Sequence, residues 1–244
     1  GRDCTREFSA AQMVEIEDRL QLGGLLRGAI AHAELELHYQ PRLAVRASQV
    51  SGFEALLRWN SANLGRVPPS RFIPVAETLG LMPAIGEWVL AEACRQAQVW
   101  IARGHRDFNI AVNVSAAQLQ RPGLVALVRA ALQEHALPSG TLSIELTESA
   151  LMENVAQVAE TLNELKAIGI SLALDDFGTG YSSLAYLRQF PIDHLKIDQR
   201  FVRGLPDDAD DAAIARAIVA MSHQLHLSVT AEGVETQTQA QFLE

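Results

Sequence analysis

The acidic pair Asp175-Asp176 is the first place in the sequence where chemistry could occur. It closes a short apolar segment, residues 170–174, and a glycine-containing turn follows it. Burying two adjacent carboxylates costs free energy unless a metal ion, a cationic side chain or an exposed position compensates their charge. The pair therefore indicates either an ion-binding site or the exposed end of a buried strand.

Five other short apolar segments carry a polar residue within them or directly after them: Glu54, Asn113, Glu145, Lys196 and Glu232. A single acid in a strand is usually a satisfied salt bridge or a surface charge, but six successive segments with this feature predict one shared site. Carboxylate and amide oxygens suit Mg²⁺ or Mn²⁺ better than Zn²⁺. Adjacent acids could hold two ions at the roughly 3.5–4 Å spacing of two-metal phosphoryl chemistry. Lys196 is either the single cation of an acidic ring or a buried counter-ion to Asp175.

The elements that must position these residues follow a βα rhythm, with strand starts about every 20–35 residues. The connection at 44–49 is too short for a helical crossover, so the first two strands should be antiparallel neighbours. Residues 60–70 are expected to form a loop. The other strands should place their polar residues at the carboxyl end of a barrel, where the active sites of βα barrels lie. The expected strands are 35–43, 50–59, 109–114, 141–146, 170–175, 193–197 and 227–231, and the expected helices lie within 1–30, from 70, and at 85–101, 123–136, 154–167, 182–189, 211–225 and from 236.

Composition narrows the class of protein. The chain has 244 residues, of which 48% are hydrophobic and 20% charged, with a net charge of −9. These values are typical of a soluble globular protein, long enough for one large α/β barrel or two small domains, and they argue against a binder of nucleic-acid polymers that relies on a basic surface. A small anionic ligand remains compatible if metal ions reverse the local field. No apolar run approaches the ~20 residues of a membrane span, and the polar N-terminus does not resemble a signal peptide.

Other possible sites carry less weight. Cys4 and Cys94 lie far apart and are expected to be reduced thiols in a cytoplasmic protein. The turn at 176–180 could cradle a phosphate, but it lacks the Walker spacing, so Gly178 and Gly180 more simply permit a positive φ. The chain begins at Gly1, which suggests a piece of a longer protein.

The motifs, in this order, resemble the EAL-domain phosphodiesterases, a family named for the tripeptide found here at Glu54-Ala55-Leu56. The resemblance extends from about Leu25 to the end of the chain. It also includes Tyr39-Gln40-Pro41, residues 72–77, Asn113-Val114-Ser115, Glu145-Leu146-Thr147-Glu148, residues 175–180, Lys196-Ile197-Asp198 and residues 232–236.

The resemblance implies a TIM-like (β/α)8 barrel whose first strand runs antiparallel to the rest. It implies hydrolysis of cyclic di-GMP, a bacterial second messenger, to linear 5′-pGpG with two Mg²⁺ or Mn²⁺ ions. By position, the ligands of the first ion are Glu54, Asn113, Glu145 and Asp175, and those of the second are Asp175 and Asp176. Lys196 matches a lysine that orients the nucleophilic water, and Glu232 matches the general base or water-positioning residue.

Further residues match supporting roles in the family. Gln40 and Arg58 match substrate contacts, and Asp198 matches a substrate-side or supporting residue. Glu148 matches a glutamate that steadies the loop at 176–183, which contains Gly178. Glu235 matches another acid that supports the site.

The family normally continues past Glu244 with a last strand that contains Gln-Gly, so that strand is expected to be missing here. Residues 1–25 resemble the helical lead-in that often follows a GGDEF domain, and residues 26–244 then form the phosphodiesterase domain. The resemblance also implies a homodimer and an upstream GGDEF or sensory domain, through which the parent protein could be anchored to a membrane. Two alternatives remain open: an inactive domain that binds cyclic di-GMP as a receptor, and a scaffold or dimerisation domain whose acidic ring is structural.

Overall fold

The computed structural model describes residues 10–45, 47, 49–178 and 189–244. Eight strands form one mixed sheet, in the spatial order β1-β2-β4-β5-β6-β7-β8, with the short strand β3 paired to β2. Their bounds are Leu35–Ala44 (β1), Gln49–Ser61 (β2), Gly65–Val67 (β3), Ile110–Asn113 (β4), Leu142–Thr147 (β5), Ser171–Phe177 (β6), His194–Ile197 (β7) and Ser228–Ala231 (β8).

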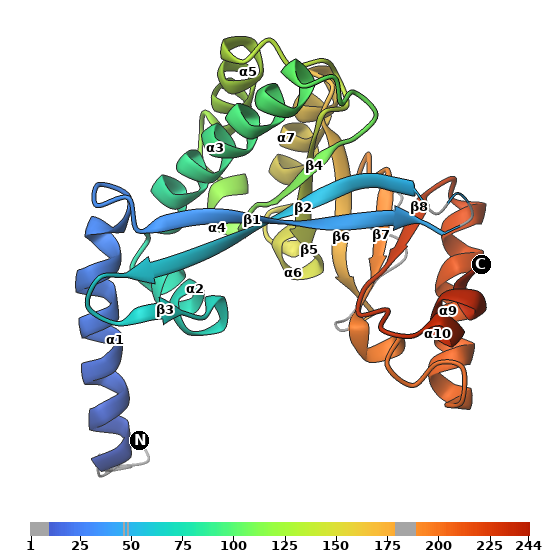
Figure 1. The fold of residues 1–244 in the computed structure, drawn as a ribbon, viewed down its shortest axis with the longest axis horizontal. Helices are drawn as coiled ribbons and strands as arrows, with labels where there is room; N and C mark the ends of the chain where they lie inside the picture. Colours follow the sequence, from blue (N-terminus) through green and yellow to red (C-terminus); the bar gives the residue numbers. More distant parts are fainter. Residues whose placement is uncertain (1–9, 46, 48, 179–188) are drawn as a thin grey trace.

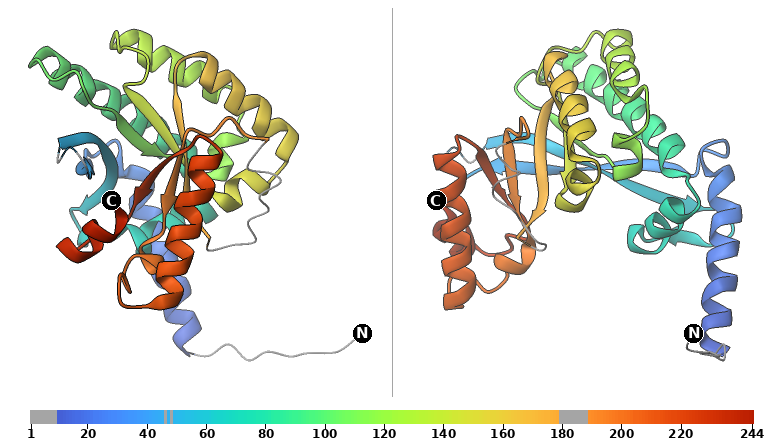
Figure 2. Two further views of the ribbon diagram at one scale, coloured as in Figure 1. Left: turned by 90° about the vertical axis from the view of Figure 1, so that its right-hand side faces the viewer. Right: turned by 180° about the vertical axis from the view of Figure 1, so that it is seen from behind.

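The sheet curls, and helices cover its outer surface (Figure 1, Figure 2). The helices are α1 (Ala10–Ala29), α2 (Pro69–Thr78), α3 (Met82–Ala102), α4 (Ala116–Leu119), α5 (Leu124–Glu134), α6 (Glu148–Met152), α7 (Val155–Ala167), α9 (Ala209–Gln224) and α10 (Gln237–Leu243), with a 3₁₀ turn, η1, at Gln199–Phe201. Helix α1 extends away from the body of the molecule, and its last turns contact α2. The architecture is a partial (β/α)8 barrel.

Strand directions confirm the expected antiparallel first strand. β1 pairs antiparallel with β2, whereas β2, β4, β5, β6, β7 and β8 are parallel neighbours in sequence order. β1 and β8 are the two ends of this path and do not pair with each other among the described residues. The barrel is therefore open between them in the described part of the chain.

Residues 60–70 differ from the expected loop. β3 pairs with the end of β2 through Trp59 and Val67, and α2 begins at Pro69. Trp59 is fully buried, and its ring meets the ring of Phe72 edge-on, 5.6 Å away between centroids. Burial of these two aromatic rings holds the segment against the body of the protein. The loop-forming residues of this segment did not indicate that packing. The helix expected at 182–189 falls almost entirely outside the described residues.

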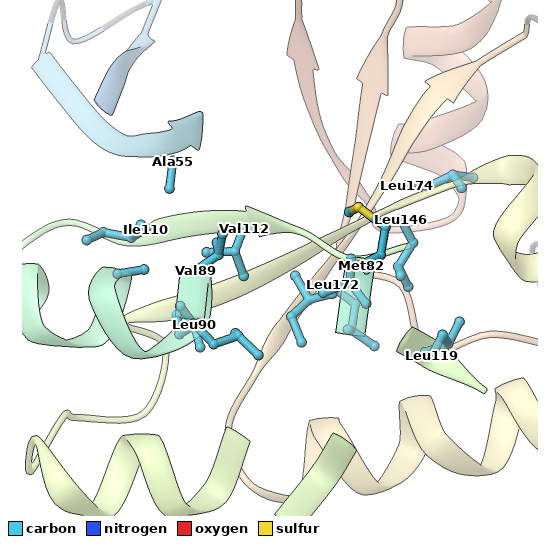
Figure 3. Close-up of a cluster of buried hydrophobic side chains, with 14 of the residues drawn as sticks. Ala55, Met82, Val89, Leu90, Ile110, Val112, Leu119, Leu146, Leu172 and Leu174 are labelled. Atoms are coloured by element: carbon cyan, nitrogen blue, oxygen red, sulfur yellow. The ribbon is translucent and has the colours of Figure 1, made fainter. Parts of the chain in front are cut away.

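The hydrophobic core lies between the sheet and its helices. Figure 3 shows Val89 and Leu90 of α3 beside Ile110 and Val112 of β4, with Leu172 of β6 in the same cluster. All five side chains are buried. Because successive side chains of a strand point to opposite faces, this packing against the helices directs the alternate positions of the same strands into the barrel.

Candidate active site at the carboxyl ends of the strands

Lys196 of β7 is the centre of the candidate site. Its Nζ lies 2.6 Å from Glu145 Oε2, 2.6 Å from Glu232 Oε1, 3.1 Å from Asp175 Oδ2 and 3.2 Å from Glu54 Oε2. The lysine side chain is 3% exposed and that of Glu145 is fully buried. One ammonium therefore contacts four carboxylates from β2, β5, β6 and the residue after β8.

Strand register brings these residues together. Glu54 of β2 accepts a hydrogen bond of 2.9 Å from Asn113 Nδ2 at the end of β4, and Asn113 lies opposite Glu145 in the β4–β5 ladder. Glu232 follows β8 directly, and its N–H donates to the carbonyl of Ile197, next to Lys196. The structure thus brings Glu54, Asn113, Glu145, Asp175, Lys196 and Glu232 together, and their roles in a shared site stay predictions.

The Asp175-Asp176 pair lies at an irregularity in the sheet. The register between β6 and β7 shifts between Leu174 and Phe177, and Asp176 adopts a left-handed conformation with φ 55°. Asp175 faces Lys196, while its other oxygen, Oδ1, accepts the N–H of Asp176 at 2.9 Å. Bulges of this kind redirect side chains and are common beside active sites. Here the two adjacent carboxylates have different partners: Asp175 contacts Lys196, and Asp176 is hydrogen-bonded to Asp198.

Asp176 is hydrogen-bonded to Asp198 rather than to Lys196. Burial, followed by the charges of Asp175 and Asp198, raises the pKa of Asp176. Burial opposes ionisation of Asp198 too, but hydrogen bonds from Arg200 outweigh it and lower the pKa of Asp198. The pKa values of the two hydrogen-bonded carboxyl groups are therefore shifted in opposite directions.

We call Lys196, the four carboxylates that it contacts (Glu54, Glu145, Asp175 and Glu232) and the adjacent amide of Asn113 the acidic ring, or simply the ring. The charges of the ring do not balance. Burial raises the pKa of Glu145 to about 7, although the charge of Lys196 acts in the opposite direction. Burial also raises the pKa of Glu232. For Lys196 burial favours the neutral amine, but Glu145, Glu54 and the other acids outweigh this effect and raise its pKa. The lysine is therefore charged, and the ring has more negative charge than it can neutralise.

The donor atoms of the ring match a hard divalent cation, because they are carboxylate and amide oxygens. Among the described residues, however, no group of three or more His, Cys, Asp or Glu side chains is arranged around a point that could hold a metal ion. The ammonium of Lys196 lies between the carboxylates instead. A divalent ion thus fits the chemistry and the surplus charge of these acids.

The remaining residues singled out by sequence surround this ring. Gln40 is exposed on β1, directly across the ladder from Glu54. Arg58 lies further along the same face of β2 and donates to the carbonyl of Leu57 at 2.9 Å. Glu148 is buried at the start of α6. Their proposed contacts with substrate or loop stay predictions.

Two other residues lie at the edges of this region. Glu235 is exposed, and its N–H donates to Gln239 Oε1 at the start of α10. Gly178 has φ 93°, and a Cβ there would lie 3.0 Å from the ring of Phe201, so both backbone and space favour glycine. Gly180 lies outside the described residues.

Sequence reasoning missed one basic residue of the site. Arg42 of β1 reaches Glu145, with Nη1 3.3 Å from Oε1, and its other arm is hydrogen-bonded to Asn109 Oδ1. The alternation of side chains along β1 could have identified it. Arg42 lies two positions after Gln40, hence on the same face of the strand, opposite Gly52 of β2.

The fold and the ring define the class: an α/β-barrel protein with an acidic site at the carboxyl ends of its strands. Comparison with known proteins then identifies the family. Residues 25–244 match the EAL domain, so the chain belongs to the EAL domain family.

Similar proteins include two from Pseudomonas aeruginosa. The chain is 46% identical over 243 residues to the bifunctional diguanylate cyclase/cyclic di-GMP phosphodiesterase MucR, covering 100% of this chain and 36% of MucR. It is 45% identical over 243 residues to the cyclic di-GMP phosphodiesterase NbdA, covering 100% of this chain and 31% of NbdA. The chain thus spans about a third of the length of these curated relatives.

A solved structure supports the fold. The structure described as the PaMucR phosphodiesterase in complex with c-di-GMP superimposes with a TM-score of 0.87 at 48% identity, covering 91% of this chain and 90% of that one. No helix in the described part of this chain is both long and apolar enough to cross a membrane.

Proposed function

We propose that this chain hydrolyses cyclic di-GMP to linear 5′-pGpG and does so with two Mg²⁺ or Mn²⁺ ions. The observation that carries the proposal is the contact of Lys196 with four carboxylates at the strand ends. The names of MucR and NbdA, and the cyclic di-GMP bound in a structure with the same fold, supply the substrate class.

The residues of the ring are suited to direct a water molecule at phosphorus. Hydrolysis forms a bond from the water oxygen to phosphorus and breaks the bond from phosphorus to the ribose 3′ oxygen. Lys196 would donate a hydrogen bond to the water, and Glu232, 2.6 Å from the lysine, would accept the water's proton. The raised pKa of Glu232 suits a general base. The proton then passes to the 3′ oxygen, so the products are a 5′ phosphate and a 3′ hydroxyl.

The first metal ion would be held by Glu54, Asn113, Glu145 and Asp175. The second would be held by Asp175 and Asp176. When bound, such ions lower the pKa of water and neutralise phosphate charge. On the β1–β2 ribbon, Gln40 and Arg58 lie on the same face as Glu54 and would contact the substrate. Asp198 holds Asp176 in the structure and would lie at the substrate side.

The experiment that tests the proposal is hydrolysis of cyclic di-GMP with Mn²⁺ in ¹⁸O-labelled water, followed by chromatography and mass spectrometry. The expected product is pGpG with one ¹⁸O on its terminal phosphate. Asp175→Asn is the paired variant, and it should form no product. Unlabelled product would contradict attack by water on phosphorus.

Equilibrium dialysis with cyclic di-GMP and with Mn²⁺, added to the hydrolysis assay, separates the two alternatives. An inactive receptor binds cyclic di-GMP in equilibrium dialysis and forms no product. A scaffold whose ring is structural binds neither the nucleotide nor the metal. Either result would overturn hydrolysis as the function of this chain.

A further inference from the structure

The side chain of Arg42 approaches the acidic ring from inside the barrel. It is 18% exposed, and it spans Glu145 on β5 and Asn109, which precedes β4. Strand β1 is thereby connected to two strands on the far side of β2. None of the roles derived above for metal, water or substrate uses this residue.

Gly52 makes room for this connection. It lies opposite Arg42 in the β1–β2 ladder, and a Cβ there would be 2.9 Å from Arg42 Nη2 and 2.6 Å from Asn109 Oδ1. It would also be 2.8 Å from the carbonyl oxygen of Asn109, which accepts the N–H of Phe53. Any larger residue would have to displace the arginine or the neighbouring backbone. The glycine is therefore matched to the path that Arg42 takes.

Arg42 and Lys196 divide the two oxygens of Glu145 between them. Oε1 faces Arg42 at 3.3 Å, and Oε2 faces Lys196 at 2.6 Å. The side chain of Glu145 is fully buried, so no water can replace either partner without rearrangement. A cation on one oxygen fixes the plane of the carboxylate and leaves the other oxygen directed into the ring.

We propose that Arg42 is a positioning residue that holds Glu145 Oε1 so that Oε2 is presented to the cation bound in the ring. The inference rests on the proposed function, because it assigns Glu145 to a divalent ion. Partners that orient metal ligands in this way are worth about 10–100-fold in metal affinity or activity. In the described part of the chain, the hydrogen bonds of the Arg42 guanidinium go to Glu145 and Asn109, neither of which is a proposed substrate contact or general base.

A purely electrostatic role and a positioning role of Arg42 predict opposite changes in divalent-cation affinity when Arg42 is replaced. If the arginine were only a nearby positive charge, its removal would strengthen the binding of a divalent cation, because like charges repel. If it positions Glu145, its removal weakens binding, because a required ligand is no longer directed into the ring. The sign of the change therefore decides between the two.

The experiment measures the Mn²⁺ dissociation constant by equilibrium dialysis, with kcat and KM for cyclic di-GMP, in wild type, Arg42→Met and Arg42→Lys. Arg95→Met is the matched control, since Arg95 pairs with Glu92 on the exposed face of α3. Arg42→Met should weaken Mn²⁺ binding about tenfold and lower kcat with KM unchanged. Arg42→Lys should lie between, because an ammonium lacks the second arm that reaches Asn109. The control should match wild type.

Equal or tighter Mn²⁺ binding by Arg42→Met would overturn the inference. If that variant does not fold, Asn109→Ala takes its place: it keeps both charges, removes the second contact of Arg42, and should weaken Mn²⁺ binding. If wild type binds no Mn²⁺, the proposed function fails separately. The inference is then decided by a crystal structure of Arg42→Lys, in which a rotated Glu145 carboxylate supports it and an unmoved one overturns it.

Discussion

Asp193 and Lys196 lie near opposite ends of β7, and they differ in how many groups of opposite charge or hydrogen-bonding character surround them. Asp193, directly before the strand, receives Lys166 Nζ at 2.6 and 2.7 Å, the N–H of Leu172 at 2.8 Å and Ser171 Oγ at 3.2 Å. Lys196, within the strand, faces four carboxylates. One carboxylate thus has several donors, whereas one ammonium has too many acceptors.

The pKa shifts record this difference. Burial opposes ionisation of Asp193, but the hydrogen bonds from Lys166 and Leu172 outweigh it and lower its pKa. In the ring, burial raises the pKa values of Glu145 and Glu232. A carboxylate whose charge is met by several hydrogen bonds stabilises a fold, while carboxyl groups whose pKa values burial raises are typical of functional sites. The amino end of the strand therefore stabilises the barrel, and the carboxyl end has the unbalanced charges on which the proposed function rests.

Replacing Glu54 by Ala should have the largest effect. It removes a proposed metal ligand and should lower kcat/KM for cyclic di-GMP by about 10⁴-fold or more, equivalent to about 5.5 kcal/mol. The melting temperature without metal should not fall, because one acid fewer competes for Lys196. Product formation by chromatography and thermal unfolding check the two halves. Near wild-type production of pGpG would show that the assignment of Glu54 is wrong.

Replacing Lys196 by Met should be next. Four carboxylates would lose their common cation, and removal of one partner from a buried charge cluster costs about 3–5 kcal/mol. Urea unfolding of the metal-free protein measures the loss. Mg²⁺ should restore part of it, since the ion supplies the missing charge. An unchanged free energy of unfolding would mean that the ring does not need the lysine.

Replacing Asp193 by Asn should have a smaller effect, and that effect should be on stability rather than on kcat. It removes charge-assisted hydrogen bonds of about 1–3 kcal/mol, and the partial exposure of Asp193 places the loss toward the lower value. Because Asp193 lies at the amino end of β7, kcat should stay at the wild-type value. Stability and kcat are measured on the same preparation. A large loss of kcat without a loss of stability would reverse the comparison between the two ends.

The smallest effect is a pH dependence. The folded-state pKa of Asp193 lies below its usual 3.8, so its stabilisation is fully present above that value. It should be lost as the pH falls through the lower folded-state pKa. The difference in unfolding free energy between wild type and Asp193→Asn should be constant from pH 7 to about 5 and shrink below about 3.8. A difference that grew toward acid would contradict this account of Asp193.

Much of the fold follows from local sequence patterns. Short apolar strands that alternate with amphipathic helices predict the parallel arrangement, and the short connection after β1 predicts the antiparallel first pair. β3 was missed because it has only three residues and its pairing accompanies the burial of Trp59 against Phe72. Such contacts depend on tertiary packing, which periodicity does not record.

The site shows the same division. Glu54, Asn113, Glu145, Asp175, Lys196 and Glu232 could be grouped from sequence because each lies within or directly after an apolar strand, and such residues meet at the carboxyl end of a barrel. Arg42 was missed because it lies on the antiparallel strand, where no strand-end rule applies. The pairing of Asp176 with Asp198 was also missed, because it depends on a shift in register between β6 and β7.

The most direct test of the account is Mn²⁺ binding by equilibrium dialysis to wild type, Asp175→Asn and Asp193→Asn. Each variant removes one carboxylate charge from the protein, and the two differ only in which end of the barrel loses it. The account predicts that Asp193→Asn binds Mn²⁺ like wild type and that Asp175→Asn binds it far more weakly. Equal binding by all three proteins, or no binding by any, would contradict the claim that the unbalanced ring is a cation site.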